Sequence, residues 1–429
     1  MKPPTSRMTG SNNATHHLRR TFSSLKVRNF RLFFIGQSVS LSGIWVQRVA
    51  QAWLVLELTN SGTAVGLVTA LQYLPVLVLA PVGGVIADRL DKRLILIITQ
   101  AGSAVSAATL GMVTLFDVVE LWMVFVLAFG LGVAGSIGNP ARQTFVLEMV
   151  GSDQLTNALS LNSTLMNAAR IVGPAIAGLL IAGVGLAWCF LFNGLSYLAV
   201  IAALLLMKVD ELERAARQPR KTGQVREGLH YVKRTPSVLI PILMMAMAGT
   251  FAYEYQVVLP LLARFTFDGN AQTLALMTSA MGVGAVAGGL LTASRQKHGN
   301  STLIRTAAVF GGLQVLAALM PGLWASLVLL MVLGAAGLAF IAIGNSTVQL
   351  ACAPEMRGRV MGLWAVAFLG STPIGGPIMG WIGESLGARW ALGLGGVAVL
   401  IAVLVATSVL RRSRKFPTDP MSSTLSKDA

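Results

Sequence analysis

Three ionisable side chains fall inside long apolar stretches of the sequence, namely Arg48, Arg170 and Glu254. A charge in the middle of a bilayer costs ~3 kcal/mol or more unless it is paired or hydrated, so each one is a candidate functional residue. A carboxylate at that depth can exchange a proton, because a nearby arginine favours its charged form and loss of the arginine favours its neutral form. We therefore take Glu254 as the candidate proton-binding group. The alternative is a static buried pair with Arg48 that only fixes helix packing.

The segments that must position these residues are apolar and numerous. Of the 429 residues, 54% are hydrophobic and 12% are charged, whereas a soluble protein carries about a quarter charged residues. A membrane helix takes ~20 apolar residues, so the composition predicts an all-α membrane protein with twelve transmembrane helices. The expected spans lie at about 32–56, 64–87, 94–116, 119–140, 159–182, 187–207, 238–263, 272–293, 303–321, 324–350, 361–383 and 390–410.

The basic residues predict the orientation of these spans, because positively charged loops stay on the cytoplasmic side. With the amino terminus inside, 29 of the 33 Lys and Arg residues fall in cytoplasmic loops and tails. Only Arg264 and Arg389 fall in outer loops. We therefore expect both termini in the cytoplasm. The net charge of +16 then reflects orientation and contact with anionic lipid headgroups, and we expect no nucleic-acid partner.

The two halves of the chain repeat each other weakly, which predicts two pseudo-symmetric six-helix halves. Short glycine-containing strings recur at offsets of 203 to 206 residues. They are Gly138-Asn139 with Gly344-Asn345, Gly83-Gly84 with Gly288-Gly289, and Gly173-Pro174 with Gly376-Pro377. Arg48 and Glu254 also differ by 206, so they occupy equivalent positions on the first helix of each half. Such a repeat is typical of a transporter whose halves rock around a central site.

The expected domain organisation follows from these spans. A basic tail (1–29) precedes the first half (30–207), and a basic linker (208–237) precedes the second half (238–410) and a tail (411–429). We interpret the linker as an amphipathic connector that faces the headgroups. The two cysteines and four histidines show no spacing typical of a metal site or a thiol enzyme, so we expect no enzyme activity, metal or cofactor.

A dense set of charges follows the second span, in Gly84-Val-Ile-Ala-Asp88-Arg89-Leu-Asp91-Lys92-Arg93. Gly84 allows close helix approach, and Asp88 can accept hydrogen bonds from the amino terminus of a neighbouring helix. Arg89 and Arg93 can pair with carboxylates across the two halves. We interpret this cluster as a cytoplasmic gate, made in one conformation and broken in the other. The alternative is a solvated basic turn.

The same segment resembles the signature loop of the major facilitator superfamily, G-x-x-A-D-R-x-x-[KR]-R. Over about residues 26–410, further strings resemble one bacterial branch, that of the enterobactin exporters and macrolide-efflux proteins. They are Asn29-Phe-Arg-Leu-Phe, Trp45-Val-Gln-Arg-Val-Ala-Gln-Ala-Trp-Leu-Val-Leu-Glu-Leu-Thr59, Asn139-Pro-Ala-Arg-Gln143 and Pro354-Glu-Met-Arg-Gly-Arg359. The resemblance implies the major facilitator fold and export of small molecules across a bacterial inner membrane, driven by the proton gradient. We expect a monomer.

The family's antiporter motif resembles Arg170-Ile-Val-Gly173-Pro174-Ala-Ile-Ala-Gly178, whose Gly-Pro pair recurs as Gly376-Pro377. Small residues let helices touch, and Pro174 bends its helix and frees a carbonyl. Ordinary small-residue packing explains the string equally well. Arg170 either contacts the central cavity or satisfies carbonyls near Pro174.

In the fold that this chain resembles, the first helix of each half lines a central cavity, which places Arg48 and Glu254 there. Polar and aromatic neighbours add lining, or serve as glue between helices. They are Gln37, Gln47, Gln51, Thr250 and Phe251. The chain departs from the family's pattern at Ala52, where many relatives have an acid, and in residues 125–138, which lack the basic motif of proton-coupled exporters.

The function expected from these observations is proton-coupled efflux of amphiphilic small molecules, either drugs or siderophore-like metabolites. One alternative is an importer of a small nutrient with the same fold. The other is a transport-inactive membrane sensor. The spans offer few polar anchors and many Met and aromatic residues, which favours the exporter.

Overall fold

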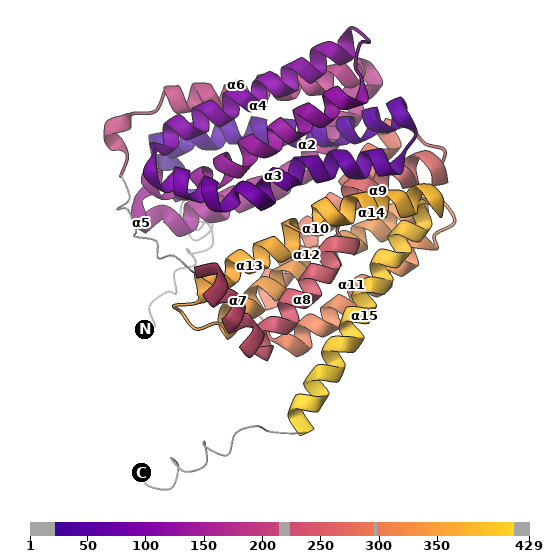
Figure 1. Cartoon of the computed structure of the whole chain (residues 1–429). Coiled ribbons are helices and arrows are strands. Elements are labelled where there is room, and N and C mark those ends of the chain that lie inside the picture. Colours follow the sequence, from indigo (N-terminus) through magenta and orange to yellow (C-terminus); the bar gives the residue numbers. More distant parts are fainter. Residues whose placement is uncertain (1–21, 214–223, 296–297, 416–429) are drawn as a thin grey trace, which may run out of the picture.

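The computed structural model describes residues 22–213, 224–295 and 298–415, which are mostly helical (Figure 1). The first half holds η1 (Ser23–Lys26), α2 (Arg28–Thr59), α3 (Gly62–Arg89), α4 (Lys92–Leu115), α5 (Leu121–Gly183) and α6 (Leu186–Leu205). The connector holds η2 (Val209–Glu211) and α7 (Gln224–Arg234). The second half holds α8 (Pro236–Phe251), α9 (Tyr255–Leu261), η3 (Leu262–Thr266), α10 (Ala271–Arg295), α11 (Asn300–Ala318), α12 (Leu323–Ala351), α13 (Arg357–Leu369), α14 (Thr372–Ser385) and α15 (Ala388–Lys415).

Twelve spans account for these helices. Ten stretches of the described residues are long and apolar enough to cross a membrane. One of them, α5, has 63 residues and counts as two spans, because Gly151 interrupts it with a φ of +68° that only glycine adopts without strain. The twelfth span is α2, where Arg48 and its neighbouring glutamines lower the hydropathy of a 32-residue helix. The predicted all-α fold with twelve membrane helices is confirmed.

Two spans of the second half are broken helices. α8 and α9 are separated by residues 252–254 within one apolar stretch, and α13 and α14 by residues 370–371 within another. Backbone groups that a break frees inside a membrane must find partners in the protein. The carbonyl oxygen of Ala252 accepts a hydrogen bond from Nε2 of Gln314 on α11, at 3.2 Å. The first break therefore has a partner on a neighbouring helix.

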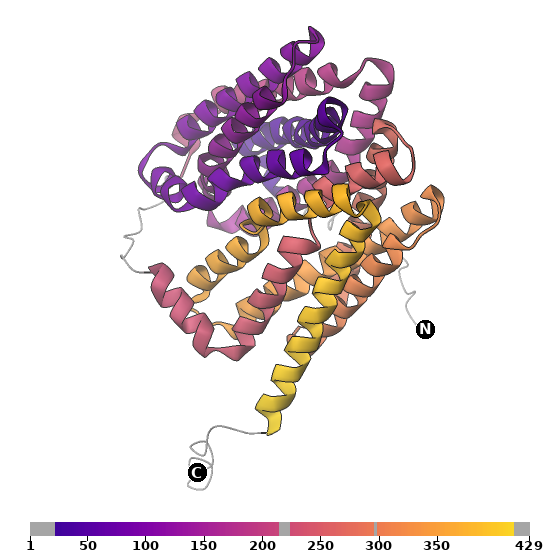
Figure 2. The same ribbon diagram turned by 45° about the vertical axis from the view of Figure 1, so that its right-hand side comes forward.

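The two six-helix halves lie side by side as distinct groups of helices (Figures 1 and 2). The main contacts between them join α3 to α14 and α5 to α10. The halves are closest where α9 and α14 approach α2 and α3, and their ribbons diverge towards α7 and the start of α13 (Figure 1). The two groups of helices correspond to the two halves of the predicted fold, and the predicted domain boundaries stay a prediction.

The second part of the connector is fixed to the second half. On α7, Val232 is buried, and the hydroxyl of Tyr231 accepts a hydrogen bond from the backbone N–H of Ala353 at 3.0 Å. Glu227 forms an ion pair of 2.7 Å with Arg359 on α13. Residues 214–223 of the predicted linker, 1–21 of the predicted first tail and 416–429 of the last lie outside the described residues.

Glycines form the contact between α3 and α14, which we call the glycine seam: Gly62 and Gly66 on α3, and Gly376 and Gly380 on α14. A Cβ atom on Gly66 would collide with the carbonyl oxygen of Gly376, and one on Gly380 with that of Gly62. The two backbones therefore touch across the halves, which small residues alone permit.

Filling the glycine seam should force the halves apart. We expect Gly66→Leu to lower the thermal unfolding midpoint of the purified protein, because overpacking of a tight contact costs about 1–3 kcal/mol. The matched control is Gly102→Leu on α4, where an added Cβ would have no neighbour within 4 Å. Equal midpoints for the two variants would contradict the seam as a close contact.

Candidate substrate and proton site

Two arginines from different helices converge on one tryptophan. The guanidinium carbon of Arg48 on α2 lies 4.7 Å from the ring centroid of Trp45, and that of Arg170 on α5 lies 5.5 Å from it. α2 and α5 approach closely here because Gly173 faces Trp45, and a Cβ at residue 173 would collide with the Cβ of Trp45. The antiporter-like string thus brings the two charges together.

These arginines are short of hydrogen-bond partners. The Nε atoms of Arg48 and Arg170 are both buried and lack an acceptor among the described residues. No ion pair involves either residue in the described part of the chain, and Arg170 lies within electrostatic range of Arg48, Tyr73 and Tyr253. Both side chains are half-buried rather than fully buried. The structure therefore holds two like charges near the middle of the spans.

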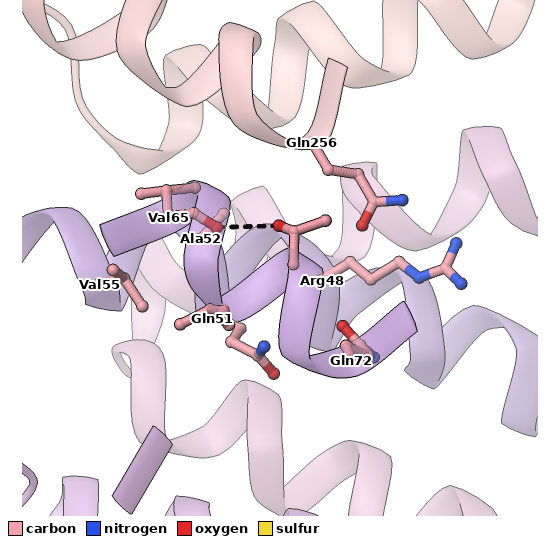
Figure 3. A pocket seen from close by; sticks show the side chains of 9 residues that line it. Arg48, Gln51, Ala52, Val55, Val65, Gln72 and Gln256 are labelled. Atoms are coloured by element: carbon pink, nitrogen blue, oxygen red, sulfur yellow. Dashed lines mark hydrogen bonds between the residues drawn. The ribbon is translucent and has the colours of Figure 1, made fainter. Parts of the chain in front are cut away.

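Arg48 reaches into a small cavity that both halves line. The lining comes from α2 and α3 of the first half and from Gln256 on α9 of the second. The guanidinium extends with Gln256 on one side and Gln72 on the other (Figure 3). Nε2 of Gln256 also donates a hydrogen bond to the hydroxyl of Tyr73 across the halves, at 3.2 Å. The cavity measures about 20 Å³, room for about one water molecule.

Glu254 lies at the break between α8 and α9. Its side chain is 3% exposed, and its Oε1 atom has no hydrogen-bond partner in the described residues. The carboxylate lies against Gly375 and Gly376 of α14, with the hydroxyl of Thr372 within hydrogen-bonding reach. Because Gly376 also belongs to the glycine seam, the carboxylate sits directly behind the contact between the halves.

Arg48 and Glu254 do not form an ion pair in this conformation. Arg48 points into the cavity between α2, α3 and α9, whereas Glu254 is buried against α14. Their equivalent sequence positions thus place them on the first helix of each half without bringing their charges into contact. The role of Glu254 as a proton carrier remains a prediction.

Aromatic residues surround the break beside Glu254. Tyr253 stacks on Phe310 with ring centroids 5.1 Å apart and packs edge-on against Phe368 at 5.3 Å. Its hydroxyl donates a hydrogen bond of 2.7 Å to the carbonyl oxygen of Gly337 on α12. Sequence reasoning missed this cluster, because its members come from the break, from α11 and from α13, which are far apart in the sequence. A tyrosine immediately before an intramembrane acid was the available signal.

The other candidate lining residues divide between cavity and packing. Gln51 lines the cavity of Arg48. Gln47 joins α2 to α6 by accepting a hydrogen bond of 2.6 Å from Asn193, and Gln37 is 2% exposed with its Nε2 unpaired within the described residues. Thr250 and Phe251 lie in the last turn of α8, where the Thr250 hydroxyl donates to its own helix and both backbones face glycines of neighbouring helices.

The predicted packing motifs lie at contacts between helices. The space beside Gly178 is closed by Ala275 of α10, and Gly376 and Pro377 lie against Gly66 of α3. Pro174 is buried within α5, next to the glycine that faces Trp45. These residues thus join the halves as well as helices within one half.

The predicted gate residues lie where α3 ends and α4 begins. Gly84 is buried, Arg89 is exposed, and the side chain of Asp88 lies outside what the structure describes. Nε of Arg93 donates a hydrogen bond of 2.7 Å to the carbonyl oxygen of Leu204, so Arg93 caps the end of α6 within its own half. Closure of this end by the cluster remains a prediction.

Sequence reasoning also missed two contacts made by acidic side chains, an ion pair and a set of hydrogen bonds. Lys92 forms an ion pair with Glu148 of α5, whose side chain is buried. At the opposite end, Oε2 of Glu384 accepts hydrogen bonds from Oγ of Ser61 at 2.7 Å, and from the backbone N–H and Oγ1 of Thr63 at 2.9 and 2.8 Å. Glu384 on α14 thus ties the halves together beside the glycine seam. We call this end of the molecule the Glu384 end.

Two six-helix halves that meet around buried ionisable groups have the architecture of a secondary transporter. Macrolide efflux protein A of Streptococcus pyogenes is 23% identical over 391 residues, covering 88% of this chain and 96% of that protein. The enterobactin exporter EntS of Salmonella typhimurium is 22% identical over 395 residues, covering 91% and 94%. The crystal structure of the nucleoside transporter NupG shares the fold, with a TM-score of 0.72 at 14% identity over 90% of this chain and 99% of that one.

The family described as transmembrane secretion effector matches residues 19–425, nearly the whole chain. The protein belongs to this family of the major facilitator superfamily, and it is a multi-pass membrane transporter. The resemblance seen in the signature loop and the further strings is confirmed. Members of the family are transporters rather than enzymes.

Loss of the Glu384 contacts should open the Glu384 end. We expect Glu384→Ala to increase several-fold the labelling of Ala52→Cys, a cavity position, by a membrane-impermeant maleimide added from that side. The background for this assay carries Cys189→Ala and Cys352→Ala, since both native thiols are free and buried. The matched control is Glu120→Ala, whose carboxylate accepts from Trp122 of its own half. Unchanged labelling in Glu384→Ala, or an equal rise in the control, would argue against the contact as a closure.

Proposed function

We propose that the protein exports amphiphilic small molecules, either drugs or siderophore-like metabolites, in exchange for protons by alternating access. The proposal places it in a bacterial inner membrane with both termini in the cytoplasm, as a monomer that contacts anionic headgroups. Two relatives named as a macrolide efflux protein and an enterobactin exporter support the direction and the kind of substrate. The orientation is supported by the distribution of basic residues, which puts the Glu384 end outside.

The observation that carries proton coupling is the burial of Glu254 at the contact between the halves. Among the described acidic residues, Glu254 and Glu148 are the buried ones, and Glu148 has Lys92 as its partner. A carboxylate buried without a cation is favoured in its neutral form, since the charged form loses hydration without compensation. In the proposed cycle, Glu254 is therefore protonated while the Glu384 end is closed.

Separation of the halves would change this balance. Glu254 touches Gly375 and Gly376, and Gly376 packs on Gly66 of the other half. Parting α3 from α14 would admit water to the carboxylate from the Glu384 end, and closure would remove that water again. The protonation of Glu254 and the position of the halves are thereby linked, as an ion-coupled transporter requires.

Replacement of Glu254 tests the coupling. We expect Glu254→Gln to lower pH-gradient-driven efflux about ten-fold or more, because glutamine keeps the shape of the side chain and cannot release a proton. The measurement uses inside-out membrane vesicles with an imposed pH gradient and a substrate found as described below. Glu57→Gln is the control, because Glu57 is an exposed acid on α2. Full gradient-driven efflux by Glu254→Gln would exclude this residue as the proton carrier.

A growth assay with a panel of compounds tests the direction of transport and identifies a substrate for the vesicle measurement. We expect cells that produce the protein to resist some lipophilic compounds better than cells without it, and to lose this protection when a protonophore is added. The readout is growth inhibition across the panel. Faster entry of a nutrient into the cells that produce the protein would instead indicate the importer.

A further inference from the structure

We propose that the central site selects amphiphiles that carry an organic acid group, which binds to Arg48 and Arg170 together. The inference rests on the proposed export function, since it names the chemical class of what is exported. It starts from the two guanidinium groups that lie near the ring of Trp45, at 4.7 and 5.5 Å from its centroid. Within the described residues, no carboxylate forms an ion pair with either of them.

Two neighbouring cations in a membrane interior lack the compensation that such charges normally find. Like charges repel more strongly at low dielectric, and each half-buried guanidinium also loses part of its hydration. The ring of Trp45 compensates in part by cation–π attraction. The Nε atoms of Arg48 and Arg170 nevertheless keep unused donors. An anion that contacts both guanidinium groups would remove the repulsion between them.

The groups around the arginines suit an acid attached to a larger body. A guanidinium presents a planar fork of N–H donors that matches a carboxylate in two-point geometry. The side chains that line the cavity beside Arg48 are amides such as Gln51 and Gln72, the hydroxyl of Thr69 and apolar groups, and none of them is acidic. A cationic amphiphile would find two positive charges here and no carboxylate beside them.

The anion must bind between the halves rather than within the cavity. That cavity, at about 20 Å³, admits about one water molecule, so the acid group alone already exceeds it. Arg48, Arg170 and Trp45 are each half-buried, and the residues around them come from both halves: Gln256 beside Arg48, and Gly282 of α10 against the backbone of Arg170. The acid therefore contacts the arginines at the surface where the halves face each other.

The test compares two fluorescent amphiphiles that share one ring system and differ in charge, dansylglycine and dansylethylenediamine. With the full-length protein in detergent, we expect dansylglycine to bind and the amine to bind at least about ten-fold more weakly. We expect Arg48→Gln and Arg170→Gln each to weaken dansylglycine binding by about ten-fold or more, the range for a lost charged hydrogen bond. Equal binding of the acid and the amine by the wild type would overturn the proposal.

A matched control separates charge at the site from charge in general. Arg264 also lies over a tryptophan of α2, 5.7 Å from the ring of Trp53, but at the Glu384 end beside Asn60. We expect Arg264→Gln to bind dansylglycine as the wild type does. If it weakens binding as much as Arg48→Gln, or if the two central variants bind normally, the assignment is wrong.

Thermal unfolding adds a readout that does not depend on fluorescence. Removal of one of two like charges should leave the unfolding midpoint without ligand unchanged or higher, so the variants are expected to fold. Dansylglycine should raise the midpoint of the wild type and not that of Arg48→Gln, because a ligand stabilises the state that binds it. An equal rise with inorganic phosphate or chloride alone would indicate a site for small anions and would overturn the proposal that the ligand is an amphiphile.

The two proposals fail separately. If dansylglycine binding depends on the arginines while the growth panel shows no export, the proposed acid selectivity is supported and the proposed export function is wrong. If pH-gradient-driven efflux requires Glu254 while the arginine variants bind and export dansylglycine normally, the proposed export function is supported and the proposed acid site is wrong.

Discussion

A charge in the middle of a membrane must be paired or hydrated, and this requirement governs the centre of the molecule. Arg48, Arg170 and Glu254 all lie near the contact between the halves, and no ion pair joins any two of them. Trp45 compensates the arginines in part. The remaining compensation has to come from what enters between the halves, such as water, a proton or a ligand. The proposed alternating access would change the space around these three residues.

The fold could be predicted from the sequence because it depends mainly on the burial of apolar residues in the membrane, and the apolar segments can be read directly from the sequence. Apolar length marks each span, and the basic residues mark alternate loops, so twelve helices in two halves could be predicted without contacts. The breaks at 252–254 and 370–371 were missed for different reasons. Pro373, in the first turn of α14, was a readable signal for a new helix. Residues 252–254 contain no proline or glycine, and their break depends on partners such as Gln314 of α11.

The residues of the site could be predicted from the sequence better than their arrangement in space. The rarity of intramembrane charges and the repeat offset identified Arg48 and Glu254 as positions, whereas the direction of each side chain depends on neighbours that no pattern reveals. Gln47 illustrates the limit, because a glutamine beside Arg48 in sequence bonds to Asn193 of α6 instead of lining the cavity. Glu384 was missed because an acid at the end of a span looks ordinary until Ser61, more than three hundred residues away, is seen to donate to it.

The contacts that hold the Glu384 end closed are of a kind that can be reversed. The glycine seam brings the backbones of α3 and α14 together at glycines, which have no side chains of their own to disengage when the two helices part. The hydrogen bonds to Glu384 lie at an exposed position, where water can replace each at a net cost of about 1 kcal/mol. A closure held by a few kcal/mol is comparable to the cost of one uncompensated charge at Glu254, Arg48 or Arg170. In the proposed cycle, a single proton or a single bound anion is therefore enough to decide which conformation the halves adopt.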